Sequence, residues 1–455
     1  MRRFIFIFLS LSFCFFYLNS AFGFNIVYPR KEKVTINSPR TFFIGNENPE
    51  KFLYINNEKV ELYRTGGFKH SVELDYGKNK FIIKNDAGKE VEYVIYRPEQ
   101  VNVPIVVKRN VFTPSIYGYT TDKTILRVSP VDRGLNRLQQ LPSGILLEII
   151  GEYGDFYDVR LGRDDNAWIA KNQIILSEEN DLSGEIFDKI IEEKDNKVIL
   201  KVFTDRKLPY YISENEGLDL YLFNVKNAPF YRYEDSLPQN KLFGYTSYYT
   251  EDNVLVIEMK KPPVINKTKP LKNIKIVIDP GHGGKETGTI GCLGTKEKEI
   301  NLLLAQKLKS RLNDEGANVY LTRDDDEYVD LYDRVDFANN LGADIFISIH
   351  NNALSDSLAN KDISGTEVYY FYPQAKPLAK AIMNGINQFA NTKNNGIKGE
   401  SFAVIRNSNA VSVLLEVAYM INPEEDEKLS TPEFQDAVIE GIIKGLENYI
   451  NDIQK

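Results

Sequence analysis

The sequence predicts a multidomain protein in which all-β modules are followed by one C-terminal α/β domain. Its 455 residues correspond to about three domains of ~150 residues each. Tyrosine (27 residues) and phenylalanine (26 residues) are abundant, and these aromatic residues favour β-strands. Short alternating runs fill the chain up to residue 262, after which apolar strands alternate with helical patterns. The net charge of −8 argues against a nucleic-acid-binding protein, which normally carries a basic face.

The N-terminal segment 1–23 is identified as a secretory signal peptide. A positively charged start precedes residues 4–17, which are almost wholly apolar, and Ala21 and Gly23 place small residues before a cleavage site. The alternative is an uncleaved N-terminal anchor, although the apolar run is short for a membrane-spanning helix. We expect an exported protein, in the periplasm or at the cell wall, with no membrane span after cleavage. The two cysteines are too few for a disulfide framework.

Three all-β modules are predicted between the signal peptide and the last domain. Residues 24–100 alternate apolar and polar side chains between turns spaced about ten residues apart, which resembles a bacterial Ig-like sandwich. Residues 104–178 resemble a bacterial SH3-like barrel in the order of their strands and turns. Residues 183–262 form a further β-rich segment of unknown type. We interpret His70 as a surface histidine and Trp168 as a core or rim residue of the barrel.

A proline-rich polar linker, residues 263–272, is predicted to separate these modules from the α/β domain, residues 273–455. Three apolar runs in the last domain predict strands of a largely parallel sheet, and two helical patterns lie between them. Because the carboxyl ends of parallel strands meet at one edge of a sheet, residues that follow these strands are candidates for a functional site. The predicted strands are Ile274–Ile278, Ala317–Leu321 and Asp344–Ile349, and the helices begin at Lys296 and Leu331.

Three ionisable residues follow apolar strands of this domain. His282 comes after the first strand, His350 after the third, and Glu416 after a further strand, Val411–Leu415. Imidazole is a common zinc ligand, and a catalytic zinc site uses three protein ligands and one open position. Each histidine also has a simpler interpretation, with His282 in a tight turn that begins at Asp279 and His350 as a core histidine. The pattern predicts a metal site at this edge of the sheet.

The third ligand is expected to be a carboxylate, and Glu297 is the candidate. Thr295 is a credible N-cap for the helix that follows, which would place Glu297 in the first turn, where the helix dipole favours a negative charge. Glu297 could also be no more than a favourable first-turn acid. Glu416 stands inside an apolar run, residues 411–421, where a buried carboxylate is costly unless it is paired, metal-bound or functional.

Five motifs occur in order along the last domain. They are Ile276-Val-Ile-Asp-Pro-Gly-His-Gly-Gly284, Lys296-Glu-Lys-Glu-Ile-Asn-Leu302, Val319-Tyr-Leu-Thr-Arg323, Ile347-Ser-Ile-His-Asn-Asn352 and Val413-Leu-Leu-Glu-Val-Ala-Tyr419. As a set, they resemble the zinc-dependent N-acetylmuramoyl-L-alanine amidases of the amidase-3 type. The resemblance extends over residues 273–451 and implies a C-terminal α/β zinc amidase domain.

The resemblance implies that His282, Glu297 and His350 are zinc ligands and that Glu416 is the catalytic carboxylate. Glu299 is the alternative candidate for this third ligand. The family's glutamate falls between two lysines, however, which is the position of Glu297 here. It also implies Zn²⁺ as the cofactor and peptidoglycan as the substrate. The expected reaction is hydrolysis of the amide that joins N-acetylmuramic acid to L-alanine.

Two other functions remain open. A zinc carboxypeptidase acting on the stem peptide would share the metal chemistry, and a catalytically inactive wall-binding scaffold would need none. Some relatives carry an autoinhibitory helix after the second histidine, but only residues 351–364 separate His350 from Gly365, so none is expected here. Cys292 is interpreted as incidental. The β-modules are expected to place the enzyme at the wall or to contact a cell-envelope partner protein, and residues 273–455 are expected to be active alone.

Overall fold

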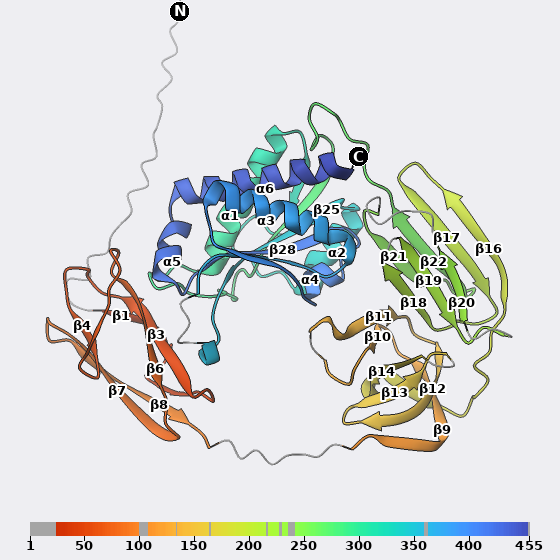
Figure 1. Cartoon of the computed structure of the whole chain (residues 1–455), viewed down its shortest axis with the longest axis horizontal. Helices are drawn as coiled ribbons and strands as arrows, with labels where there is room; N and C mark the ends of the chain where they lie inside the picture. The colour runs from red at the N-terminus through yellow and green to blue at the C-terminus, as the bar shows by residue number, and fades with distance from the viewer. Residues whose placement is uncertain are drawn as a thin grey trace, which may run out of the picture.

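The computed structural model describes residues 24–99, 108–132, 134–162, 165–214, 217–226, 230–234, 242–358 and 363–453. The predicted signal peptide lies outside these residues. Figure 1 shows the helices gathered in the C-terminal part, with the N-terminal strands on one side of it and the other β-rich parts on the opposite side. No helix among the described residues has both the length and the hydrophobicity needed to cross a membrane.

Residues 24–99 form two sheets around one apolar core. Side chains from both sheets, among them Phe43, Leu53 and Ile95, are fully buried between them. One sheet contains, in order, β1 (Asn25–Tyr28), β3 (Arg40–Asn46) and β6 (Gly67–Glu73). The other contains, in order, β2 (Lys33–Thr35), β8 (Glu90–Arg97), β7 (Gly77–Asn85), β4 (Leu53–Ile55) and β5 (Glu58–Val60).

Residues 110–177 form one seven-stranded antiparallel sheet. Its long strand β9 pairs with both β12 and β15. The strands are, in order, β11 (Arg137–Leu141), β10 (Thr124–Arg127), β14 (Asn166–Ala170), β13 (Phe156–Arg160), β12 (Leu146–Tyr153), β9 (Asn110–Thr120) and β15 (Ile174–Ser177).

Residues 186–260 form two further antiparallel sheets. Most of their buried apolar side chains belong to the same cluster as those of the seven-stranded sheet, as Leu147 and Leu220 illustrate. One sheet contains β16 (Ile186–Glu193), β17 (Lys197–Thr204), β22 (Val254–Lys260) and β21 (Tyr245–Tyr249). The other contains β18 (Tyr210–Glu214), β19 (Leu218–Phe223) and β20 (Phe230–Glu234). The β-rich character predicted for the region before the last domain is confirmed.

The C-terminal domain is built on a six-stranded sheet. The order is β24 (Asn318–Leu321), β23 (Lys275–Pro280), β25 (Ile345–Asn352), β28 (Val411–Tyr419), β26 (Thr366–Tyr370) and β27 (Asn394–Gly399). The first four strands are parallel, whereas β26 and β27 run in the opposite direction. Along β23, Ile276 and Ile278 enter one apolar cluster and Val277 enters another, so the sheet is covered on both faces.

The helices divide between these two faces. Helices α1, α3 and α6 supply buried residues to the larger cluster, and α2 and α4 supply them to the smaller one. The helices are α1 (Glu297–Asp314), α2 (Leu331–Leu341), α3 (Lys376–Ala390), α4 (Ala403–Arg406), α5 (Pro423–Leu429) and α6 (Pro432–Ile453).

Two strands extend further than the sequence indicated. Strand β23 continues to Pro280, so Asp279 lies in the strand and not in a turn. Strand β28 continues to Tyr419, so Glu416 lies inside the strand and not after it. The reason is pairing on both sides, because β28 stays in register with β25 and β26 through Glu416.

Helix α1 begins one residue later than expected. Lys296 occupies the N-cap position without a side-chain capping bond, and Glu297 is the first helical residue. Thr295, the predicted N-cap, instead closes the preceding turn, because its carbonyl accepts a 2.8 Å hydrogen bond from the Gly291 amide. Glu297 is still in the first turn of the helix.

The N-terminal sandwich packs against the C-terminal domain. The Tyr28 and Thr41 hydroxyls donate hydrogen bonds of 2.9 and 2.6 Å to the Asp356 carboxylate. Phe42 and Ile44 of β3 form a small apolar cluster with three residues of the C-terminal domain, Cys292, Tyr419 and Ile421. The sandwich therefore covers an apolar surface that would otherwise face water.

The segment before and within the predicted linker also contacts the C-terminal domain. Phe243 is fully buried in its larger cluster and stacks on Tyr449, with ring centroids 5.9 Å apart. Lys260 forms a 2.7 Å ion pair with Asp344. Leu271, inside residues 263–272, is buried in the same cluster. The β-rich segment is therefore packed onto the domain that follows it.

Candidate metal centre and active site

The three predicted metal ligands meet at the carboxyl edge of the sheet. His282, Glu297 and His350 each place a ligand atom within 4.8 Å of the others. The His282 Nε2 atom lies 3.2 Å from Glu297 Oε1, and the His350 Nδ1 atom lies 3.0 Å from the same oxygen. The two imidazole rings meet edge to face, with centroids 4.9 Å apart. Such a cluster can bind a metal ion.

Two glycines allow this close approach. A Cβ atom on Gly281 would lie 2.2 Å from the His350 ring, and one on Gly288 would lie 2.5 Å from Glu297 Oε2. His282 itself has a φ of 60°, a left-handed conformation that is costly for a residue other than glycine. Larger residues at either glycine would push the ligands apart.

A buried ion pair holds the loop that carries His282. Asp279 Oδ1 and Arg334 Nη1 are 2.8 Å apart, and both side chains are almost completely buried. Arg334 also donates 2.8 Å hydrogen bonds to the carbonyls of Pro280 and His282. Burial opposes ionisation of Asp279, but the charge of Arg334 and three hydrogen bonds outweigh it and lower the pKa of this carboxyl. From the sequence, Asp279 was expected only as a turn residue, and no role was predicted for Arg334.

Glu297 is buried and accepts hydrogen bonds on both oxygens. The Thr289 amide donates to Oε2 at 2.8 Å, and the Asn351 amide donates to Oε1 at 3.1 Å. Burial alone would raise the pKa of Glu297, but hydrogen bonds to His282 and His350 outweigh it and lower the pKa overall. The carboxylate is therefore kept in the ionised form that a metal ligand requires.

The donor set fits a zinc ion. Two imidazole nitrogens and one ionised carboxylate are ligands of catalytic zinc sites, which keep a fourth position open. Glu299, the competitor of Glu297, is outside the cluster, because it is exposed and pairs with Lys296 at 3.1 Å. Within the described ranges, no other group of His, Cys, Asp and Glu side chains is close enough to hold a metal ion.

Glu416 lies beside this cluster on β28. It is the register partner of His350 on β25 and of Glu367 on β26. Register partners point to the same face of a sheet, so these three side chains gather on one side. The buried Glu416 Oε2 atom has no hydrogen-bond partner among the described residues. Burial, followed by the negative charges of Glu297 and Glu367, raises the pKa of Glu416 well above its usual range.

Glu367 is a candidate functional residue that the sequence analysis missed. Lys398 donates to its carboxylate at 2.6 Å and the Tyr419 hydroxyl donates at 3.0 Å, while the Tyr369 hydroxyl donates a further bond. These partners outweigh the effect of burial and lower the pKa of Glu367, so its charge persists beside Glu416. The sequence signal that could have indicated Glu367 is a single acidic residue within the apolar strand β26. The same kind of pattern led to the prediction of Glu416.

The other residues considered from the sequence lie away from the cluster. Cys292 is a buried free thiol whose Sγ donates to the Ile421 carbonyl at 3.4 Å, and burial raises its pKa. His70, interpreted as a surface histidine, is half-buried on β6, 3.8 Å from Glu58. Trp168 is partly exposed on β14. None of the three belongs to the candidate metal centre.

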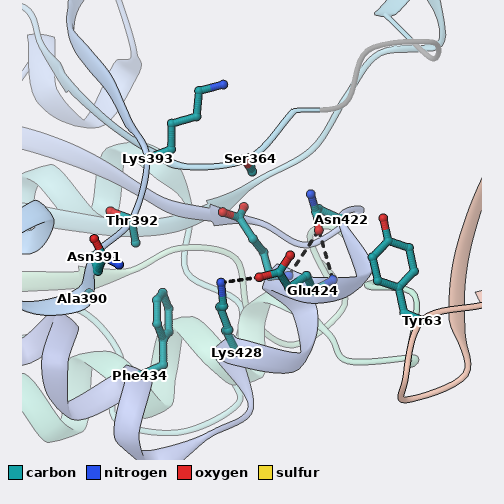
Figure 2. Close-up of a pocket in the computed structure, with 11 residues that line it drawn as sticks. Tyr63, Ser364, Ala390, Asn391, Thr392, Lys393, Asn422, Glu424, Lys428 and Phe434 are labelled. Atoms are coloured by element: carbon teal, nitrogen blue, oxygen red, sulfur yellow. Dashed lines mark hydrogen bonds and ion pairs between the residues drawn. The ribbon is translucent and has the colours of Figure 1, made fainter.

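A small polar pocket lies between the N-terminal sandwich and the C-terminal domain (Figure 2). It has a volume of about 180 Å³, and Tyr63 of the sandwich lines it together with residues of α5. Glu424 and Lys428 form a 2.7 Å ion pair there, and the Asn422 side chain caps α5 by accepting a 3.0 Å hydrogen bond from the Glu424 amide. Its described lining contains none of the predicted metal ligands, so it is separate from the candidate centre.

The fold and the cluster define an α/β domain with a candidate metal-binding site and an adjacent carboxyl group at the carboxyl edge of its sheet. Residues 276–448 match the family model described as N-acetylmuramoyl-L-alanine amidase. The probable cell wall amidase LytH of Staphylococcus saprophyticus is 38% identical over 200 residues, which cover 44% of this chain and 65% of that protein. The uncharacterized protein YqiI of Bacillus subtilis is 34% identical over 191 residues, which cover 41% of this chain and 90% of that protein.

A solved structure is also similar. The catalytic domain of CwlV, an N-acetylmuramoyl-L-alanine amidase from Bacillus (Paenibacillus) polymyxa, is 36% identical, with a TM-score of 0.37, and the match covers 39% of this chain and 97% of that chain. The chain belongs to the N-acetylmuramoyl-L-alanine amidase family, as the motifs predicted. It spans 65% of the length of LytH, just under two thirds.

Proposed function

We propose that this protein is a zinc-dependent peptidoglycan hydrolase that cleaves the amide between N-acetylmuramic acid and L-alanine. Membership of the amidase family supports this reaction. The observation that carries the proposal is the convergence of the His282, Glu297 and His350 ligand atoms beside Glu416. Glu297 and Glu416 have pKa shifts of opposite direction, which is typical of two carboxyl groups with different roles in one site.

His282, Glu297 and His350 would hold the zinc ion. A zinc ion bound there supplies Lewis acidity toward a scissile carbonyl and lowers the pKa of water from about 15.7 toward about 7. The amides of Thr289 and Asn351 orient the Glu297 carboxylate, so the protein fixes the position of this ligand before a metal binds.

Glu416 is the proposed acid–base residue. It accepts a proton from the attacking water and delivers it to the nitrogen of the leaving amine. A raised pKa makes the ionised carboxylate a stronger base and the protonated form a usable acid near neutral pH. Glu367, held ionised by Lys398, maintains the negative charge that contributes to this shift.

Analysis of reaction products tests the proposal. Full-length protein with zinc is incubated with purified peptidoglycan, and the soluble products are identified by mass spectrometry. The expected products are glycan chains without peptides and stem peptides with a free N-terminal L-alanine. Stem peptides shortened at their carboxyl end, still attached to muramic acid, would indicate the zinc carboxypeptidase instead. If neither a new free amine nor a shortened peptide appears, the result would indicate the inactive wall-binding scaffold.

The upstream β-modules are proposed to place this activity at the wall. The Ig-like and SH3-like assignments, the domain limits and a cell-envelope partner protein stay predictions. The relatives named as cell wall amidases support an exported enzyme that acts in the periplasm or at the cell wall. Binding of full-length protein and of residues 273–455 to isolated cell walls, measured by sedimentation, tests the role of the modules.

A further inference from the structure

A large polar cavity lies where the seven-stranded sheet, strand β21 and the C-terminal domain meet. Its volume is about 500 Å³. Arg127 and Arg137 line it from the seven-stranded sheet, Tyr245 from β21, and Tyr372 and Arg406 from the C-terminal domain. Its described lining includes none of the predicted metal ligands, so it is a different site from the metal centre. Three parts of the chain that are distant in sequence build it together.

Three guanidinium groups gather around one carboxylate in this cavity. Arg127 and Arg137 lie 2.7 and 3.5 Å from the same oxygen of Asp132. The charge of Arg406 acts on both Asp132 and Arg137. The buried Nε atoms of Arg127 and Arg406 have no hydrogen-bond partner among the residues that the structure describes. The cluster therefore places three guanidinium groups around a single carboxylate.

This arrangement is unfavourable for the protein alone. Burial, followed by the charge of Arg406, lowers the pKa of Arg137. Partly buried like charges are costly unless an anion compensates them. Lys123, Asp122 and Asp336 also line the cavity, so its described lining carries four basic side chains and three carboxylates, a small excess of positive charge. An anionic ligand would relieve this repulsion.

The neutral lining favours an anion that is part of a peptide or glycopeptide. Gln139, Gln140 and Asn409 offer side-chain amides, which both donate and accept hydrogen bonds, and Tyr245 and Tyr372 offer aromatic surface. Guanidinium groups bind carboxylates through two parallel hydrogen bonds. A ligand with several carboxylates and peptide groups matches these features together.

A short series of contacts connects the cavity to the active centre. Phe402 immediately precedes α4, the helix that ends at Arg406. The Phe402 ring meets the Tyr369 ring edge to face at 5.1 Å, and the Tyr369 hydroxyl donates to Glu367 beside Glu416. Asn409 of the cavity precedes β28, whereas Glu416 lies in the last part of that strand, so only an extended polymer reaches both sites.

We infer that the cavity is a second binding site, in which Arg127, Arg137 and Arg406 hold the carboxylates of an acidic stem peptide of peptidoglycan. The choice of this ligand rests on the proposed function. The same guanidinium groups could also bind a phosphate, so the experiment must separate the two anions. The site would keep the enzyme on one polymer while the metal centre acts on another part of it.

The test is isothermal titration calorimetry with full-length protein that carries Glu416→Gln, so that the ligand is not turned over. The probe is a soluble stem peptide with free carboxylates. Arg137→Gln is expected to weaken binding about tenfold, because one charge-assisted pair is lost. Arg160→Gln, which changes an exposed arginine paired with Glu148 at 2.9 Å, should leave the affinity unchanged. Asp132→Asn should tighten binding a few-fold, which a purely structural role would not cause.

Each outcome is decisive once thermal melting shows that the variants are folded. Equal affinity of the Arg137→Gln variant and its parent would overturn the inference, as would unchanged binding of a stem peptide whose carboxylates are amidated. Inorganic phosphate that binds more tightly than the stem peptide would overturn the choice of ligand. Hydrolysis of peptidoglycan without Arg137-dependent binding contradicts this inference alone. If the stem peptide binds in a way that depends on Arg137 but the wild-type enzyme does not hydrolyse peptidoglycan, only the proposed function is contradicted.

Discussion

His350 and Glu416 are direct register partners on the parallel strands β25 and β28. The backbone ladder of two core strands therefore sets the distance between a candidate metal ligand and the candidate acid–base residue. Neighbouring side chains such as Ile347 and Val413 are fully buried and hold this register. Substitutions at His350 or Glu416 should consequently change metal binding or catalysis without unfolding the sheet.

Replacing His350 by alanine should remove the metal. Wild-type protein is expected to contain one zinc per chain, and His350→Ala should bind zinc at least tenfold more weakly because one of three ligands is lost. Inductively coupled plasma mass spectrometry of the dialysed protein measures its zinc content. The control is His70→Ala on β6, which should keep its zinc. Equal zinc in the two variants would show that His350 is not a ligand.

Glu416→Gln should separate metal binding from catalysis. Glutamine has nearly the same shape but cannot accept the proton, so turnover of a soluble muropeptide should fall by about 10²–10⁴-fold. Zinc content and thermal midpoint should stay close to those of the wild type, because the Glu416 Oε2 atom makes no hydrogen bond within the described part of the chain. If the variant loses its zinc, Glu416 is a ligand and the assigned roles are wrong.

Asp426 should make folding stability depend on pH. Burial raises the pKa of Asp426 to about 6 from 3.8, so the folded state binds the proton more tightly than the unfolded state. The stabilisation is fully present below pH 3.8 and is lost as the pH rises through about 6, which amounts to about 3 kcal/mol. Because asparagine does not titrate, Asp426→Asn should remove this loss of folding stability at high pH.

Urea unfolding at pH 4 and pH 7.5 measures this effect as the difference between variant and wild type. Asp426→Asn should gain stability relative to wild type at pH 7.5 and little at pH 4. Asp436→Asn on α6, which changes an exposed aspartate paired with Lys307, is the matched control and should show no such difference. A constant difference between Asp426→Asn and wild type at both pH values would contradict the expected proton uptake.

Truncation to residues 273–455 should lower stability more than activity. The fragment lacks Phe243, which is buried in its core, and exposes the surface that Phe42 and Ile44 cover. The midpoint of thermal unfolding should therefore fall by several degrees, whereas the metal cluster and Glu416 stay in the fragment. Turnover of a soluble muropeptide, measured below both midpoints, should be within a few-fold of the full-length value. A folded, zinc-loaded fragment without activity would show that the upstream parts complete the site.

The order of elements and the converging side chains of the site could be predicted from the sequence. Apolar strands that end near His282, His350 and Glu416 predicted a common edge, and all three lie there. Glu297 was selected over Glu299 only through the family motif, because both acids fall in the first helical turn. The structure distinguishes them by burial, since Glu297 faces the histidines and Glu299 faces water.

Other contacts between segments that are distant in sequence could not be predicted. Arg334 lies on helix α2 and donates a hydrogen bond to the His282 carbonyl, and nothing in the sequence around Arg334 indicates that role. Glu367 reaches the site because β26 adds to β28 in antiparallel register, which depends on the complete sheet. The linker pattern also gave no sign that Leu271 is buried, because proline and polar residues around it indicate an exposed segment.

The hydrogen bond between Tyr28 and Asp356 joins residues 328 positions apart in the chain. During synthesis, the N-terminal sandwich emerges long before the surface on which it docks exists. Phe42 and Ile44 then remain uncovered until the last domain folds. During this time the exposed apolar side chains favour aggregation. Contacts of such long sequence separation also slow folding, since the ends of a long loop must meet before the contact stabilises anything. The final docking of the sandwich is therefore expected to be a late and slow event in the maturation of this protein.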